Sequence, residues 1–64
     1  MTYQEQIIKL RKDLLLSQAE LATLMGVSFA TVNRWEKGHH EPTIKQKRAL
    51  KELCRKKKIK WEIE

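Results

Sequence analysis

The sequence predicts an all-α fold, a compact domain of four to five short helices, and leaves open a short extended strand at its C-terminus. Apolar residues recur at helical spacing through most of the chain, and residues able to cap a helix precede several of these stretches. Only two glycines and one proline are available for turns. With 64 residues and 41% hydrophobic content, the chain is expected to form one folded domain with a small core.

The first helix is predicted from residue 3 to about residue 14. Tyr3, Ile7, Leu10 and Leu14 recur at spacings of four, three and four, which places them on one apolar stripe. This stripe is the expected packing face of the helix.

Two capped helices joined by a tight turn are predicted within residues 17–38. Ser17 and Glu20 have the spacing of a capping box, in which each side chain bonds the backbone amide of the other. Gly26 is expected to end the first of these helices in the left-handed conformation, and Ser28 to cap the next. Two capped helices with glycine at the break are typical of a helix-turn-helix. The residues of the first helix expected to face inward are Leu21, Leu24 and Met25.

The second helix of this pair, residues 29–37, has two chemically different faces. Val32, Trp35 and Glu36 fall on the packing side of the helical wheel. A carboxylate on that side needs a partner, and Arg11, at the edge of the first stripe, is the candidate. The alternative is that Glu36 lies near the surface and contacts only backbone amides. The residues on the other face are Ala30, Asn33, Arg34 and Lys37.

A fourth helix is predicted to begin at Pro42 and Thr43, after a loop at residues 39–42. Thr43 and Gln46 again have capping-box spacing. The predicted inner stripe of this helix is Gln46, Ala49, Leu50, Leu53 and Cys54. Because Cys54 is the only cysteine and the two adjacent histidines have no third ligand nearby, we expect neither a disulfide nor a metal site.

The segment 58–64 changes period, because apolar residues alternate with charged ones as in a strand. If two copies pair antiparallel about Trp61, the charged pairs are opposite in sign, which favours a two-fold dimer through this tail. The facing pairs are then Lys58 with Glu64, Ile59 with Ile63, and Lys60 with Glu62. The rival interpretations are a helix that simply continues and a tail that folds Trp61 onto its own core.

The composition favours a polyanionic partner. Lys and Arg outnumber Asp and Glu by 14 to 8, a net charge of +6, which indicates nucleic acid first and an anionic membrane surface second. We find no membrane-spanning or secretory segment and expect a cytoplasmic protein. No arrangement of nucleophile and base, paired acids or phosphate-binding glycines indicates an enzyme, so neither catalysis nor a cofactor is expected.

Several stretches together resemble one known family. SQAELA (17–22), MGVS (25–28), TVNRWEKG (31–38) and EPT (41–43), with Leu10 and Arg11 before them, resemble the phage-repressor-like helix-turn-helix family of the Cro and lambda-repressor (XRE) type. The resemblance covers roughly residues 3–54. It departs at Leu15, where many members carry glycine, and at the tail IKWEIE, where the family usually continues into a fifth helix.

The resemblance implies a lambda-repressor-like DNA-binding domain at residues 1–57, with the tail 58–64 as a possible dimer strand. The third helix would lie in the major groove of DNA. Matching the family position by position gives the base-reading residues Phe29, Ala30, Asn33 and Arg34. It gives the phosphate contacts Gln18, Ser28, Thr31, Lys37 and His39. It also implies an internal ion pair between Arg11 and Glu36.

The expected function is therefore sequence-specific binding of double-stranded DNA by a small transcription regulator. We expect a repressor that reads a near-palindromic operator as a homodimer. Two alternatives remain: an antitoxin-type autorepressor that also binds a toxin or another protein partner, and a protein-interaction module on the same fold. The charged stripe of the third helix argues against the module, because protein interfaces favour apolar centres.

Overall fold

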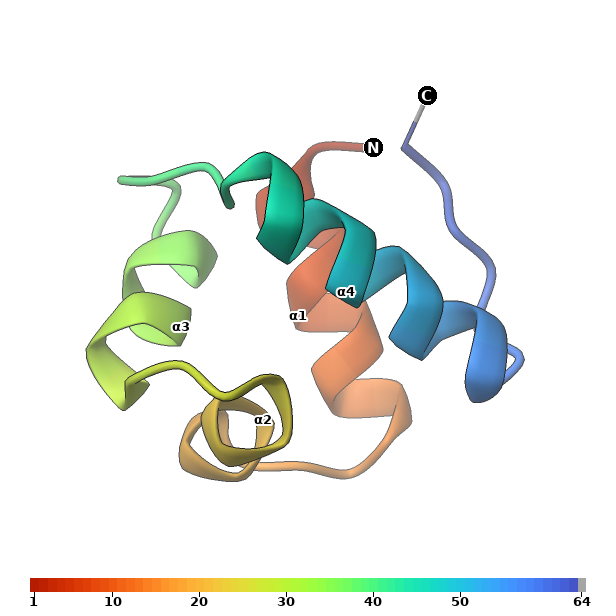
Figure 1. The fold of residues 1–64 in the computed structure, drawn as a ribbon, viewed down its shortest axis with the longest axis horizontal. Helices are drawn as coiled ribbons and strands as arrows, with labels where there is room; N and C mark the ends of the chain where they lie inside the picture. Colours follow the sequence, from red (N-terminus) through yellow and green to blue (C-terminus); the bar gives the residue numbers. More distant parts are fainter. Residues whose placement is uncertain (64) are drawn as a thin grey trace.

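The computed structural model describes residues 1–63, which form four α-helices around one small core (Figure 1). The helices are α1 (Tyr3–Asp13), α2 (Gln18–Met25), α3 (Phe29–Glu36) and α4 (Ile44–Lys56). The predicted all-α class is confirmed. The described part of the chain after α4 forms neither a fifth helix nor a strand.

Every helix begins at a hydroxyl residue whose side-chain oxygen accepts the backbone N–H three positions later, so one exposed amide of each first turn is bonded. The predicted caps Ser17, Ser28 and Thr43 all act in this way. Thr2 does the same for α1 and forms a capping box with Glu5 that the sequence analysis missed.

Every helix also ends in the same backbone motif. A residue in the left-handed conformation follows the last turn, and the next N–H donates to the carbonyl five residues earlier, as in a Schellman motif. The left-handed residues are Leu15 (φ 57°), Gly26 (φ 70°), Gly38 (φ 76°) and Lys58 (φ 57°). The closing bonds are Leu16 to Arg11 (3.0 Å), Val27 to Ala22 (2.9 Å), His39 to Arg34 (3.0 Å) and Ile59 to Cys54 (2.8 Å). Leu15 therefore adopts a backbone conformation that glycine adopts more easily.

The core draws on all four helices. Its buried members are Ile7, Leu10, Leu21, Ala22, Val32, Trp35, Leu50 and Cys54. The predicted inward positions of Leu24 and Ala49 are wrong, because Leu24 is 52% exposed and Ala49 is exposed. Both lie where α2 and α4 leave an open groove of about 430 Å³ between them, so they line a surface groove instead of the core.

The tail folds onto its own domain, which is one of the three interpretations left open by the sequence. Trp61 is half-buried and meets Tyr3 edge to face, with 5.9 Å between ring centroids. The side chain of Gln6 is fully buried and donates from Nε2 to the Lys60 carbonyl (3.0 Å), while its Oε1 accepts the Glu62 N–H (2.7 Å). The chain therefore returns to the N-terminal end of α1 (Figure 1).

Candidate nucleic-acid interface

The two helices of the predicted helix-turn-helix, α2 and α3, pack against each other. Leu21 and Ala22 of α2 and Val32 and Trp35 of α3 are buried in the shared core. Gly26 makes the left-handed turn after α2, and the cap of the next helix follows two residues later. Since one side of each helix is buried, their remaining sides face outward together.

The outward side of α3 carries the four residues predicted to read bases. Phe29 is 53% exposed, Ala30 and Arg34 are exposed, and Asn33 is half-buried. The guanidinium of Arg34 forms no ion pair among residues 1–63. The single acid of α3, Glu36, lies on the buried side, so the outward face is cationic and free to bind an anionic or polar ligand.

Arg11 and Glu36 form a bidentate ion pair between α1 and the end of α3. Arg11 Nε lies 2.6 Å from Glu36 Oε2, and Nη2 lies 3.0 Å from Oε1. A third donor, Nη1, reaches the Leu16 carbonyl at 3.1 Å. The bond to Glu36 raises the pKa of the Arg11 guanidinium, against the smaller opposing effect of burial. With side-chain exposures of 18% and 7%, the pair is largely shielded from water.

This ion pair continues into a chain of amides that reaches the outward face. Gln18 Nε2 donates to Glu36 Oε1 (3.1 Å), and Asn33 Nδ2 donates to Gln18 Oε1 (3.2 Å). An ionised carboxylate only accepts hydrogen bonds, so Gln18 must turn its NH₂ toward Glu36 and its oxygen toward Asn33. Asn33 then uses one of its two N–H bonds inward and keeps its carbonyl oxygen and its other N–H for a ligand.

The residues predicted to contact phosphate fall into two groups. Near the N-terminal ends of α2 and α3 are Gln18, Ser28 and Thr31. The Ser28 hydroxyl caps α3 and shares a 2.9 Å hydrogen bond with the Thr31 hydroxyl. At the other end of α3 the side chains of Lys37 and His39 are exposed. A helix rises 1.5 Å per residue, so Lys37 stands ~13 Å from Ser28 along the axis.

The sequence model of the helix-turn-helix family matches residues 7–56, a span that begins in the second turn of α1 and ends with α4. The chain belongs to the XRE-type helix-turn-helix family. Neither the curated proteins nor the solved structures contain a match to it.

This helix-turn-helix protein is accordingly a DNA-binding protein of the transcription-regulator class. The family is regulatory and not typically enzymatic. Among residues 1–63 no helix is long and apolar enough to cross a membrane, and no three side chains of metal-binding type gather in one place. The individual roles assigned to residues of α2 and α3 stay predictions.

Part of the site lies between helices and was not predicted from the sequence. Gln18 was predicted only as a phosphate contact, but its side chain bonds both Glu36 and Asn33. Gln4 was not predicted as part of the site at all, and its Nε2 donates to the Glu36 carbonyl at 2.9 Å. These bonds join residues 15 to 32 positions apart and depend on how the helices cross, which helical periodicity does not encode.

Proposed function

We propose that this helix-turn-helix protein is a repressor that reads a near-palindromic operator, with α3 of each of two copies in the major groove of one half-site. Two-fold placement puts successive recognition helices ~34–36 Å apart on one face of the duplex. A protein bound across a promoter excludes polymerase, which makes repression the simplest outcome. The observation that carries the proposal is the outward face of α3, which offers Arg34 and Asn33 while the opposite face of the helix is buried.

The atoms that Asn33 and Arg34 offer match the edges of two bases. After its bond to Gln18, Asn33 keeps one acceptor and one donor, the pair that the N6 amino group and N7 of adenine require. Arg34 offers two parallel donors to O6 and N7 of guanine, and each such bidentate contact discriminates against other bases by ~1–3 kcal/mol. Exposed Phe29 and Ala30 suit apolar contact with a thymine methyl group.

The remaining polar residues are suited to contact DNA phosphates, which fixes the position of the protein along the duplex but does not distinguish one base sequence from another. Ser28 and Thr31 stand at the N-terminus of α3, where unpaired amides and the helix dipole favour a phosphate. Lys37 and His39 lie at the opposite end and supply donors to a second phosphate.

The direct experiment is selection of binding sites from a random duplex pool at ~150 mM salt, where non-specific attraction is already weak. We expect an inverted repeat whose half-site contains a guanine and an adenine at neighbouring positions. A recovered site without two-fold symmetry contradicts the proposal of a near-palindromic operator. If the selection enriches no particular sequence, sequence-specific binding is contradicted.

Two substitutions then separate base reading from phosphate contact. Arg34→Ala should lose discrimination at one base pair of each half-site, whereas Lys37→Ala should weaken all sequences about equally and reduce the salt dependence. Lys56→Ala is the matched control, because it removes one exposed cation, without an ion pair among residues 1–63, from the last turn of α4, outside the helix-turn-helix. An Arg34→Ala protein with unchanged sequence preference refutes the base-reading role.

A further inference from the structure

We propose that segment 58–63 is a docking edge for the same segment of a second copy, running antiparallel about a two-fold axis at Trp61. In this arrangement the two Trp61 residues form a hydrogen-bonded pair and each Lys60 faces the Glu62 of the other copy. The inference names the contact that would make the proposed operator-reading pair. It is tested without DNA, so either proposal can fail alone.

One edge of the segment is already held in a strand-like form. The buried amide of Gln6 bonds the Lys60 carbonyl (3.0 Å) and the Glu62 N–H (2.7 Å), the two groups that flank Trp61. A residue of a neighbouring parallel strand makes the same two bonds, so the Gln6 side chain imitates a strand neighbour. The segment is therefore pre-organised, which lowers the entropy cost of adding a partner on its other edge.

The second edge is open. Backbone groups of alternate residues in an extended segment point to opposite edges, so those of Trp61 point away from Gln6. Within the described chain no hydrogen bond reaches the Trp61 N–H or carbonyl, the Ile59 carbonyl or the Ile63 N–H. The Ile59 N–H is already bonded to Cys54.

These occupied and free groups select one register. Because Gln6 occupies the backbone groups of Lys60 and Glu62, the hydrogen-bonded pair of a two-fold ribbon must be Trp61 with Trp61. Lys60 and Glu62 of opposite copies then form the adjacent non-hydrogen-bonded pair, in which side chains lie closest. Two further bonds run from each Ile63 N–H to the Ile59 carbonyl opposite.

The charges of the tail are also left without partners inside the domain. The carboxylates that accept a hydrogen bond or form an ion pair within residues 1–63 are those of Glu5, Asp13, Glu20, Glu36, Glu41 and Glu52. The carboxylate of Glu62 does neither, and the ammonium group of Lys60 is exposed and unpaired in the same part of the chain. Glu62 contributes to the raised pKa of Lys9, but Lys9 is bonded to Asp13 at 2.7 Å, the main cause of that shift.

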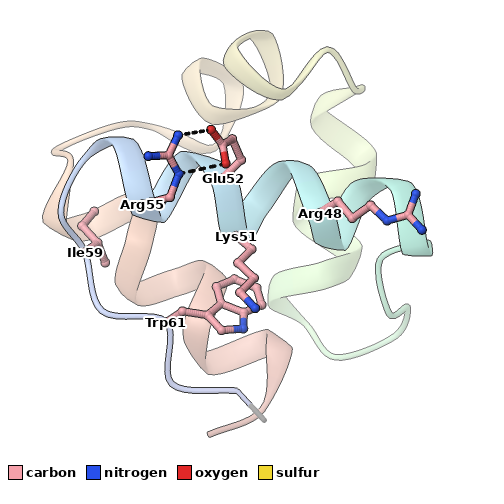
Figure 2. Close-up of a pocket in the computed structure, with 6 residues that line it drawn as sticks. All are labelled: Arg48, Lys51, Glu52, Arg55, Ile59 and Trp61. Atoms are coloured by element: carbon pink, nitrogen blue, oxygen red, sulfur yellow. Dashed lines mark hydrogen bonds and ion pairs between the residues drawn. The ribbon is translucent and has the colours of Figure 1, made fainter.

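An apolar pocket lies beside the same segment. It has a volume of about 420 Å³ and lies between α4 and the tail, with Ile59 and Trp61 on its wall (Figure 2). Residues that face each other across an antiparallel pair point to the same side of the ribbon. Ile63 of the second copy therefore comes beside Ile59, and the second Trp61 beside the first, which covers apolar surface exposed in the single domain.

The experiment measures the dimer dissociation constant by sedimentation equilibrium of the full chain without DNA, between ~1 and ~200 μM. Lys60→Glu and Glu62→Lys each place like charges at both charged contacts of the pair, so each should raise the dissociation constant roughly tenfold or more. An equimolar mixture of the two variants should recover the wild-type constant, because the mixed dimer restores opposite charges at both contacts.

Lys56→Glu, an equal change of net charge at an exposed residue of α4, should leave the dissociation constant within about twofold of wild type. Circular dichroism checks that each variant keeps its helices. A monomeric wild type at ~200 μM, single variants that dimerise as tightly as wild type, or a mixture that stays monomeric each overturn the proposal. If the wild type is monomeric, the open edge of segment 58–63 is left for a different partner.

Discussion

Replacing Leu15 by glycine should stabilise the domain, although it removes a large hydrophobic side chain. Leu15 follows the C-terminal cap of α1 with φ 57°, and it is 90% exposed, so its side chain contributes almost nothing to the core. The left-handed conformation costs an L-residue about 1–2 kcal/mol, whereas glycine adopts it freely.

The expected gain is smaller than this strain, because glycine also has more freedom in the unfolded chain. That entropy costs roughly 0.5–1 kcal/mol, which leaves a net stabilisation of about 0.5–1 kcal/mol. For a domain of this size each kcal/mol moves Tm by roughly 4–8 °C, so Leu15→Gly should raise Tm by about 2–8 °C. Thermal unfolding followed by circular dichroism at 222 nm measures this shift.

Two controls separate conformation from hydrophobicity. Leu15→Ala keeps a Cβ in the same backbone conformation and should leave Tm almost unchanged. Gly26→Ala introduces a Cβ at φ 70° with no heavy atom within 4 Å, so it should lower the free energy of unfolding by about 1 kcal/mol through strain alone. If Leu15→Gly lowers Tm as glycine does in an exposed helix, the left-handed conformation at Leu15 is wrong.

Three further substitutions test the interhelical network and a helix cap. Glu36→Gln keeps the shape of the side chain but removes the charge that faces Arg11. The free energy of unfolding, measured by urea denaturation, should therefore fall by about 1–3 kcal/mol. An unchanged midpoint of denaturation contradicts the pairing. Gln18→Leu frees the amide of Asn33. The preference for adenine at the base pair assigned to Asn33 should therefore fall roughly five- to tenfold, while the base preferences at the other positions of the half-site stay unchanged. An equal loss of base preference at every position would point to a general defect. The bond from the helix N-terminus lowers the pKa of Glu20 below 4.5 in the folded state, so its contribution to stability is present above that pH and is lost on acidification. Glu20→Gln should therefore reduce the loss of Tm between about pH 5 and pH 3, and identical pH profiles would contradict this.

Features set by a few neighbouring residues were predictable from the sequence. Capping depends on a hydroxyl and an amide three residues apart, so Ser17, Ser28 and Thr43 could be recognised by spacing alone. The burial of Val32 and Trp35 follows from helical periodicity in the same way.

Features set by how elements meet were not predictable. Gln6 is a polar residue on a helix of mixed character, and nothing within α1 indicates that it is fully buried. Its burial depends on the tail, which supplies backbone partners 54 and 56 residues away. Leu24 illustrates the converse, because an apolar residue at the right spacing stays exposed where no neighbouring helix covers it.

The site has one property that joins stability to recognition. The charge on Glu36 determines which way the amide of Gln18 points, and Gln18 in turn determines which atoms Asn33 keeps for a ligand. The same carboxylate holds α1 to α3 through Arg11. A substitution that removes this carboxylate therefore does more than loosen the fold, because it frees the amide of Gln18 and then that of Asn33 to rotate by 180°, so that Asn33 can offer donor and acceptor in the opposite order. Under the proposed base-reading role of Asn33, this rotation would change the base that it recognises, because the bases present different donor and acceptor patterns in the major groove. The proposed role of Asn33 thus ties the reading of sequence to the same carboxylate that holds the helices together.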